Sequence, residues 1–82
     1  MDKIIALRGR IDEIDNEIMK LLSERYEISD QIGNIKSTSK VQILDQKREE
    51  YVLNKTKKHS HSPQLELVYR TIMGESKNIQ RR

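Results

Sequence analysis

Apolar residues recur every three or four positions through the first half of this 82-residue chain. The repeat, called the apolar seam below, consists of Ile4, Leu7, Ile11, Ile14, Ile18, Leu21, Ile28, Ile32 and Ile35. This spacing is typical of one long helix that packs against other helices. We expect that helix to run from about residue 3 to residue 36 and to fade at Ser37, Thr38 and Ser39, whose hydroxyls compete for the backbone. Gly33 lies inside it and should weaken it by about 1 kcal/mol relative to alanine.

One position of the apolar seam, residue 25, is an arginine. A guanidinium group keeps its charge, so its burial in a helix interface is unfavourable unless an anion lies against it. That anion is either a bound ligand or an acidic side chain across the interface, and an arginine that reaches solvent is a third reading. Arg25 alone does not decide among these alternatives.

The second half of the chain contains two shorter helical patterns, at about residues 43–58 and 63–80. Ser62 and Pro63 resemble an N-cap followed by a proline at the first helical position. No strand-like alternation, repeat or glycine-rich phosphate loop appears between the patterns. The sequence therefore predicts an all-α fold, a single domain of residues 1–82 with three helices.

The length of the first helix predicts a partner subunit. A helix of some 34 residues is about 50 Å long. A compact globule of this chain length is only ~30 Å across, so the helix must protrude and expose its apolar seam. A second copy of the chain is the simplest cover for such a surface. We therefore expect a homodimer in which the long helices are entwined.

Composition limits the classes of function. The chain has no cysteine, which excludes disulfides and thiol chemistry and fits a reducing compartment. It has no apolar run long enough for a signal peptide or a membrane span, so we expect a cytoplasmic protein with no membrane partner. The net charge of +3 is modest, and basic and acidic residues are interleaved. This balance suits a small anionic ligand at least as well as a nucleic acid.

Several polar residues occupy positions that point inward in the helical patterns. Lys36 follows Arg25 by eleven residues, on nearly the same face and about 16 Å further along, so the two could clamp a ring-sized ligand. Arg8 lies on another side of the helix and could reach that ligand only from a partner subunit. The other inward polar residues are Asp45, Arg48, Glu49, Ser76 and Gln80. Taken singly, each set also fits solvated charge or a salt bridge within one helix.

In their order and spacing, these residues resemble the small all-helical class of chorismate mutase. The resemblance covers nearly the whole chain and is carried by LRGRIDEIDNEIMKLLSERYEISDQIGNIK, DQKREEYV and ESKNIQ. Its most specific features are the arginine of LLSER, the lysine of IGNIK and the D-x-x-R-E turn. It implies an isomerase that converts chorismate to prephenate, the precursor of phenylalanine and tyrosine. It also implies a homodimer whose two active sites are built from both chains.

The resemblance implies that three arginines hold the carboxylates of the dianionic substrate. Arg25 and Arg48 would act within one chain, and Arg8 would come from the partner subunit. Ser76 would support one of the carboxylates. Bidentate arginines are well suited to holding a flexible dianion in the folded conformer that the rearrangement needs.

Four further residues are implied to face the ether oxygen and the ring hydroxyl. Lys36 and Gln80 would donate to the ether oxygen, where negative charge grows as the C–O bond breaks. Glu49 would accept from the ring hydroxyl, assisted by Asp45. The rearrangement is unimolecular and needs no nucleophile, so neither a cofactor nor a metal is implied.

Three alternatives remain beside this interpretation. An isochorismate-pyruvate lyase shares the fold and the ligand type, and product analysis separates it from a mutase. A non-catalytic helical dimerisation module would have no use for the inward Arg25, Arg48 and Gln80. A nucleic-acid binder is suggested only by the pI of about 9.3, without a basic stripe interleaved with aromatics.

Overall fold

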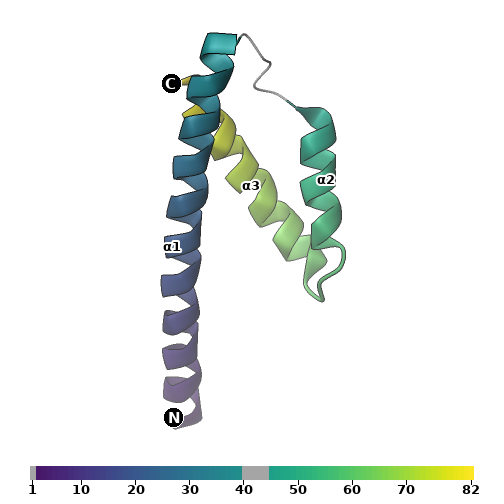
Figure 1. The fold of residues 1–82 in the computed structure, drawn as a ribbon. Coiled ribbons are helices and arrows are strands. Elements are labelled where there is room, and N and C mark those ends of the chain that lie inside the picture. Colours follow the sequence, from purple (N-terminus) through teal and green to yellow (C-terminus); the bar gives the residue numbers. More distant parts are fainter. Residues whose placement is uncertain (1, 40–44) are drawn as a thin grey trace.

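The computed structural model describes residues 2–39 and 45–82, and within these ranges the fold is all-helical. It contains three helices, α1 (Asp2–Ser39), α2 (Gln46–Thr56) and α3 (Ser62–Arg81). Figure 1 shows that α3 returns to the upper part of α1, while α2 lies beside α3. The predicted all-α class with a very long first helix is confirmed. The described helices include none that is long and apolar enough to cross a membrane.

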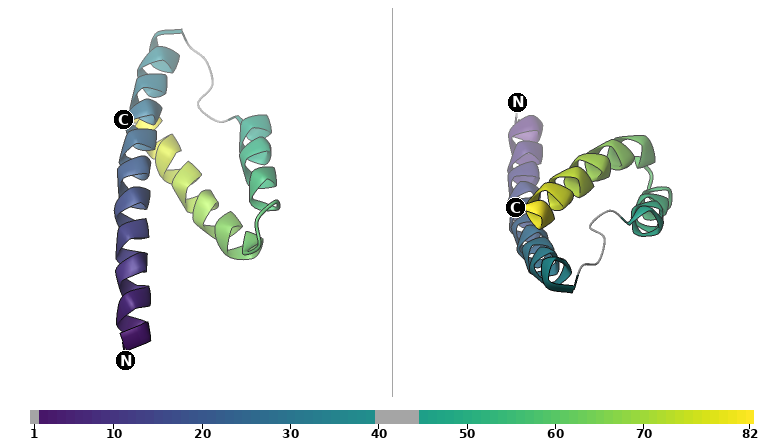
Figure 2. Two further views of the ribbon diagram at one scale, coloured as in Figure 1. Left: turned by 60° about the horizontal axis from the view of Figure 1, so that its bottom comes forward. Right: turned by 90° about the horizontal axis from the view of Figure 1, so that it is seen from above.

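α1 extends far beyond the rest of the molecule. Its 38 residues lie along the longest dimension of a chain that measures 56 × 23 × 14 Å. Its upper part packs against α3, and α2 packs against α3, whereas the backbones of α1 and α2 do not approach each other in the described ranges. The N-terminal half of α1 consequently projects alone (Figure 2).

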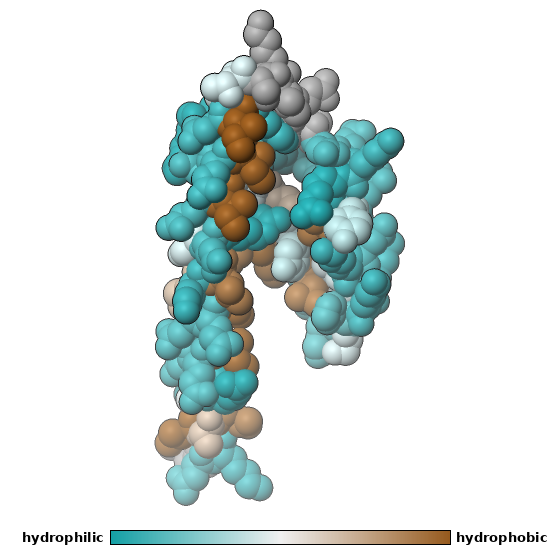
Figure 3. Space-filling model, in the orientation of Figure 1, coloured by the Kyte–Doolittle hydropathy of each residue, from teal (hydrophilic) through white to brown (hydrophobic). Residues whose placement is uncertain are grey.

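The buried core is small, and the apolar seam lies mostly outside it. Among the described residues, the buried apolar side chains are Val52, Ile72 and Met73. In the apolar seam, by contrast, Leu7 is 65% exposed and Leu21 is 61% exposed. Figure 3 shows apolar atoms in a stripe along α1. An exposed apolar surface of this length indicates a place where another molecule packs.

α1 continues past its predicted end at Lys36. The hydroxyls of Ser37 and Thr38 donate to the carbonyls of Asn34 and Ile35, each at 2.9 Å. Such bonds to the preceding turn leave the helical backbone ladder in place. The hydroxyls of Ser37 and Thr38, which we expected to help end the helix, are therefore accommodated within its last turns.

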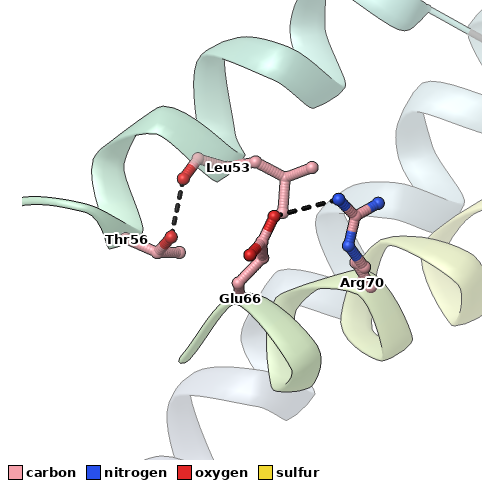
Figure 4. A network of polar contacts seen from close by, with 4 residues as sticks. All are labelled: Leu53, Thr56, Glu66 and Arg70. Atoms are coloured by element: carbon pink, nitrogen blue, oxygen red, sulfur yellow. Dashed lines mark hydrogen bonds and ion pairs between the residues drawn. The ribbon is translucent and has the colours of Figure 1, made fainter. Parts of the chain in front are cut away.

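α2 is capped at its start by a predicted site residue. The Asp45 carboxylate accepts a hydrogen bond of 3.0 Å from the backbone N–H of Arg48, as an N-cap does. The predicted start at residue 43 lies outside the described residues. At the other end, the hydroxyl of Thr56 donates to the carbonyl of Leu53 at 2.7 Å (Figure 4).

The predicted N-cap of α3 is wrong by one residue. Ser62 is already helical, and His61 is the N-cap residue, without a hydrogen bond from its side chain. The first helical bond runs from the backbone N–H of Leu65 to the carbonyl of His61, at 3.0 Å. Pro63 has no N–H, so this helix start has one donor fewer to cap.

α1 and α3 come into backbone contact at Gly33. A Cβ atom at this position would lie 2.6 Å from Cα of Gln80 and 2.7 Å from its carbonyl oxygen. Carbon atoms do not pack that closely, because their preferred separation is about 3.5–4.0 Å. The local helix propensity, which favours alanine, does not decide this position, since the missing side chain is what lets α3 rest on α1.

Candidate active site

A cavity of about 220 Å³, called the site cavity below, opens where the three helices face one another. All but one of the predicted site residues line it, namely Arg25, Lys36, Asp45, Arg48, Glu49, Ser76 and Gln80. The remaining lining residues are Ile28, Ser29, Ile32, Val52, Met73 and Lys77. Residues far apart in the sequence are thus brought together by the fold around one small volume.

Among the described residues, cations outnumber carboxylates in the lining of the site cavity. Four side chains are cationic, those of Arg25, Lys36, Arg48 and Lys77. Two side chains are acidic, those of Asp45 and Glu49. The difference of two positive charges suits a ligand with two negative charges.

Arg25 is half-buried, and a serine from another helix holds it. Its Nη1 donates to the hydroxyl of Ser76 at 2.6 Å, and that hydroxyl donates in turn to the carbonyl of Ile72 at 3.0 Å. No carboxylate of the described residues pairs with Arg25. A guanidinium has five N–H donors, so donors remain for an anion in the cavity. The reading of Arg25 as half of an ion pair within this chain is therefore not supported.

At the start of α2, Asp45 and Arg48 are already engaged in local contacts. The Asp45 carboxylate is used as the helix cap, so Asp45 lies before the first helical turn and not within it as predicted. The Arg48 guanidinium lies 5.2 Å from the centre of the Tyr51 ring, a cation–π distance. Both residues still line the site cavity. The ring contact limits the orientations open to the arginine.

Glu49 is paired across the cavity with a lysine that the sequence analysis missed. Lys77 Nζ lies 2.9 Å from Glu49 Oε1, and the two side chains are only about 30% exposed. The pair joins α2 to α3. Among the described residues, Glu49 pairs with Lys77 and not with Arg48. The alternative reading, a salt bridge within one helix, is therefore not observed. No local pattern indicated this pair, since its members lie on different helices.

Gln80, near the end of α3, brings an unsatisfied polar atom to the site. Its Oε1 is buried and has no hydrogen-bond partner among the described residues. Buried polar atoms without partners are rare, because desolvation without compensation is unfavourable. Lys36, in the last turn of α1, lines the same cavity. A polar ligand group between these residues would find hydrogen-bonding capacity there.

Arg8 is the predicted site residue that the structure does not bring to the site cavity. It lies on the projecting half of α1, seventeen residues before Arg25, which is about 25 Å along the helix. No described contact ties it to α2 or α3. Within one chain Arg8 cannot reach a ligand at Arg25.

A second and larger cavity adjoins the site cavity and is open to solvent. It has a volume of about 430 Å³ and is called the side cavity below. Its lining residues are Arg25, Arg48, Val52, Lys55, Thr56, His59, Leu65 and Tyr69. The first three also line the site cavity, so whatever fills the side cavity lies directly beside the site. Within the described ranges, no cluster of three or more His, Cys, Asp or Glu residues could hold a metal ion.

Comparison with known proteins identifies relatives of this chain. A model of the family described as chorismate mutase type II matches residues 7–81. The chorismate mutase of Methanocaldococcus jannaschii is 36% identical over 58 residues, which are 71% of this chain and 59% of that protein. A bifunctional chorismate mutase/prephenate dehydratase of Aquifex aeolicus is 40% identical over 55 residues, which are 67% of this chain and 15% of that protein. The matched part thus covers less than two thirds of each relative.

Proposed function

The chain belongs to the chorismate mutase type II family, and we propose that it is an isomerase that rearranges chorismate to prephenate. The observation that carries the proposal is the site cavity, where polar residues of all three helices meet with two more cations than carboxylates. A unimolecular rearrangement needs binding, orientation and charge stabilisation, and the lining offers these. Supply of prephenate for phenylalanine and tyrosine, and a cytoplasmic location, stay predictions from the sequence.

In this proposal, Arg25 and Arg48 hold the two carboxylates of the substrate. Each side chain is restrained before the ligand arrives, Arg25 by the Ser76 hydroxyl and Arg48 by the ring of Tyr51. Restraint reduces the side-chain entropy that is lost on binding. Ser76 acts on the carboxylate through Arg25, because its own hydrogen is donated to Ile72. The folded conformer, in which the new C–C bond can form, is selected in this way.

Lys36 and Gln80 act at the ether oxygen. As the C–O bond breaks, negative charge grows on that oxygen, and donors already in place stabilise it without reorganisation. The buried Oε1 atom of Gln80 lacks a partner among the described residues, and turning the amide by half a rotation would place its N–H₂ group at that position. The N–H₂ group would then donate to the ether oxygen of the ligand.

Glu49 accepts a hydrogen bond from the ring hydroxyl, with Asp45 nearby. The ion pair with Lys77 holds the Glu49 carboxylate at the edge of the site cavity. An ionised carboxylate only accepts hydrogen bonds, so it matches a hydroxyl and not an ether. This pairing would orient the ring within the cavity.

The complete site requires a homodimer. The apolar seam of α1 is exposed, Arg8 is out of reach of its own chain's cavity, and the side cavity beside Arg25 and Arg48 stands open. The α1 helix of a second chain would resolve all three observations. Its apolar seam would pack near Val52, Leu65 and Tyr69, and it would deliver the partner's Arg8 to the substrate. Two chains arranged in this way are entwined.

The test is the loss of chorismate absorbance on addition of the purified protein, with the product identified chromatographically. We expect prephenate from chorismate and no pyruvate from isochorismate. Pyruvate from isochorismate without prephenate would identify a lyase of the same fold instead. If neither substrate is consumed while the protein is folded and dimeric, the chain is a dimerisation module and the proposal fails.

A further inference from the structure

The backbone contact at Gly33 is made with Gln80, a residue of the candidate site. The atoms that a Cβ at position 33 would strike are Cα, C and O of Gln80, at 2.6, 3.1 and 2.7 Å. All three are backbone atoms, so the conflict could not be relieved by rotation of a side chain. The last turn of α3 would have to move by about 1 Å to reach an ordinary carbon–carbon separation. Figure 1 shows that this end of α3 lies against the upper part of α1.

The same contact links the two donors that are assigned to the ether oxygen. Lys36 follows Gly33 by three residues on α1, so it lies one turn further along and on a neighbouring part of the same face. Gln80 carries its amide on the residue that touches Gly33. The separation between the Lys36 and Gln80 side chains is therefore set by how closely the two backbones approach at Gly33.

Neither of the other two glycines has such a contact. Among the described residues, a Cβ at Gly9 or Gly74 would meet no atom within 4 Å. Gly74 lies in α3 itself, six residues before Gln80. An alanine at Gly74 should therefore favour the helix without moving it. The chain thus offers a matched control in the same helix as Gln80.

We propose that Gly33 is a positioning residue, whose missing side chain sets the Gln80 amide beside Lys36 in the site cavity. This inference rests on the proposed function. Gly33 does not touch the substrate, and it acts only through the placement of Gln80. Its substitution should therefore act on the same step as removal of the Gln80 amide, and the two effects should not add.

The experiment is a double-mutant cycle in kcat/KM for chorismate. Gly33→Ala should lower the value on the order of a hundredfold, because a misplacement of about 1 Å can cost that much. Gln80→Ala should be comparably slow, and adding Gly33→Ala to it should change the rate by less than about threefold. Gly74→Ala should keep the unmodified rate. The proposal would be overturned if Gly33→Ala lowered kcat/KM by the same factor in the unmodified protein and in Gln80→Ala. It would also be overturned if Gly33→Ala or Gln80→Ala alone left kcat/KM unchanged.

Two further measurements separate this proposal from the proposed function and from simple unfolding. The side-chain amide resonance of Gln80, observed by NMR on ¹⁵N-labelled protein, should shift in Gly33→Ala and not in Gly74→Ala. This readout needs no turnover, so it tests the placement even if chorismate is not the substrate. Gly33→Ala is also made in the Gly74→Ala background, where the helix is favoured. A protein that remains unfolded there would show that Gly33 serves folding, and the positioning role would be wrong.

Discussion

The two halves of α1 carry the same apolar repeat but have different surroundings. The C-terminal half, from about residue 25, packs on α3 and lines the site cavity. The N-terminal half projects from the molecule without a contact to another helix of the described chain, and its isoleucines and leucines are exposed. Ile28, Ile32 and Ile35 of the packed half are exposed as well, so the halves differ in what lies on their inner face. In the packed half, Arg25, Ser29 and Gly33 follow one another at intervals of four, and each is polar or small.

The difference separates two tasks that one helix performs. The N-terminal half has an apolar face, which can associate with another chain. The inner face of the C-terminal half has the cation of Arg25, the hydroxyl of Ser29 and no side chain at Gly33, so it can form a polar cavity. In the proposed dimer these tasks meet, because the exposed half of one chain completes the polar half of the other. The predictions below test that division.

The largest effect is expected from removing one arginine in each half. Arg8→Ala and Arg25→Ala should each lower kcat/KM about a thousandfold, because each leaves a substrate carboxylate without its charged partner. Unfolded together and refolded, the two variants should recover about a quarter of the unmodified activity, since half of randomly formed dimers are mixed and each has one intact site. Each variant refolded alone is the control. If refolding the two variants together recovered no activity, both arginines would belong to the site of one chain. The exposed half of one α1 would then not complete the site of the other chain.

A smaller effect, which depends on pH, is expected at the packed end. Gln80→Glu keeps the size of the side chain, but it donates a hydrogen bond only when it is protonated. At neutral pH, loss of the donor should cost roughly 3–4 kcal/mol in the transition state, a hundredfold or more in rate. Activity should return as pH falls and the carboxyl group is protonated, while the unmodified enzyme varies little on account of Gln80. Profiles of kcat/KM between pH 5 and 8 measure this.

The matched control for that profile is Gln64→Glu, an exposed glutamine near the start of the same helix. Its profile should follow that of the unmodified protein. A Gln80→Glu protein with a flat profile and an unmodified rate would remove Gln80 from the active site. The packed half of α1 would then adjoin a cavity without the proposed donor.

The smallest effect is expected from a single position in the exposed half. Ile11→Asn places a polar group in the apolar seam, and burial of one such side chain is worth roughly 1.5–3 kcal/mol. Ile11 is 54% exposed, so association can bury only about half of this side chain, at each of two positions in a symmetric dimer. Association should therefore weaken by at least about tenfold. Met19→Asn is the control, since Met19 is similarly exposed but lies beside the seam. Analytical ultracentrifugation over a concentration series measures both, and equal dimerisation of all three proteins would contradict the role of the seam.

Much of the fold, and most of the residues that line the site cavity, followed from local patterns. The three-and-four spacing predicted the long helix, and inward polar positions selected the residues that line the site cavity. The boundaries were less predictable. Ser37 and Thr38 carry hydroxyls that can end a helix or bond back to it, and the choice depends on the preceding turn. Asp45 was placed within a helical turn, but it is the cap that begins one.

The helical class, the exposed length of α1 and the excess of cations at inward positions all follow from the order of the amino acids. These properties depend on periodicity and charge, which are local. The packing of the helices, in contrast, is what pairs Glu49 with Lys77, places Ser76 against Arg25 and brings Gly33 against Gln80. Each of these contacts joins two helices, so it depends on where the helices cross and how closely their backbones approach. Periodicity within a single helix contains no information about that distance.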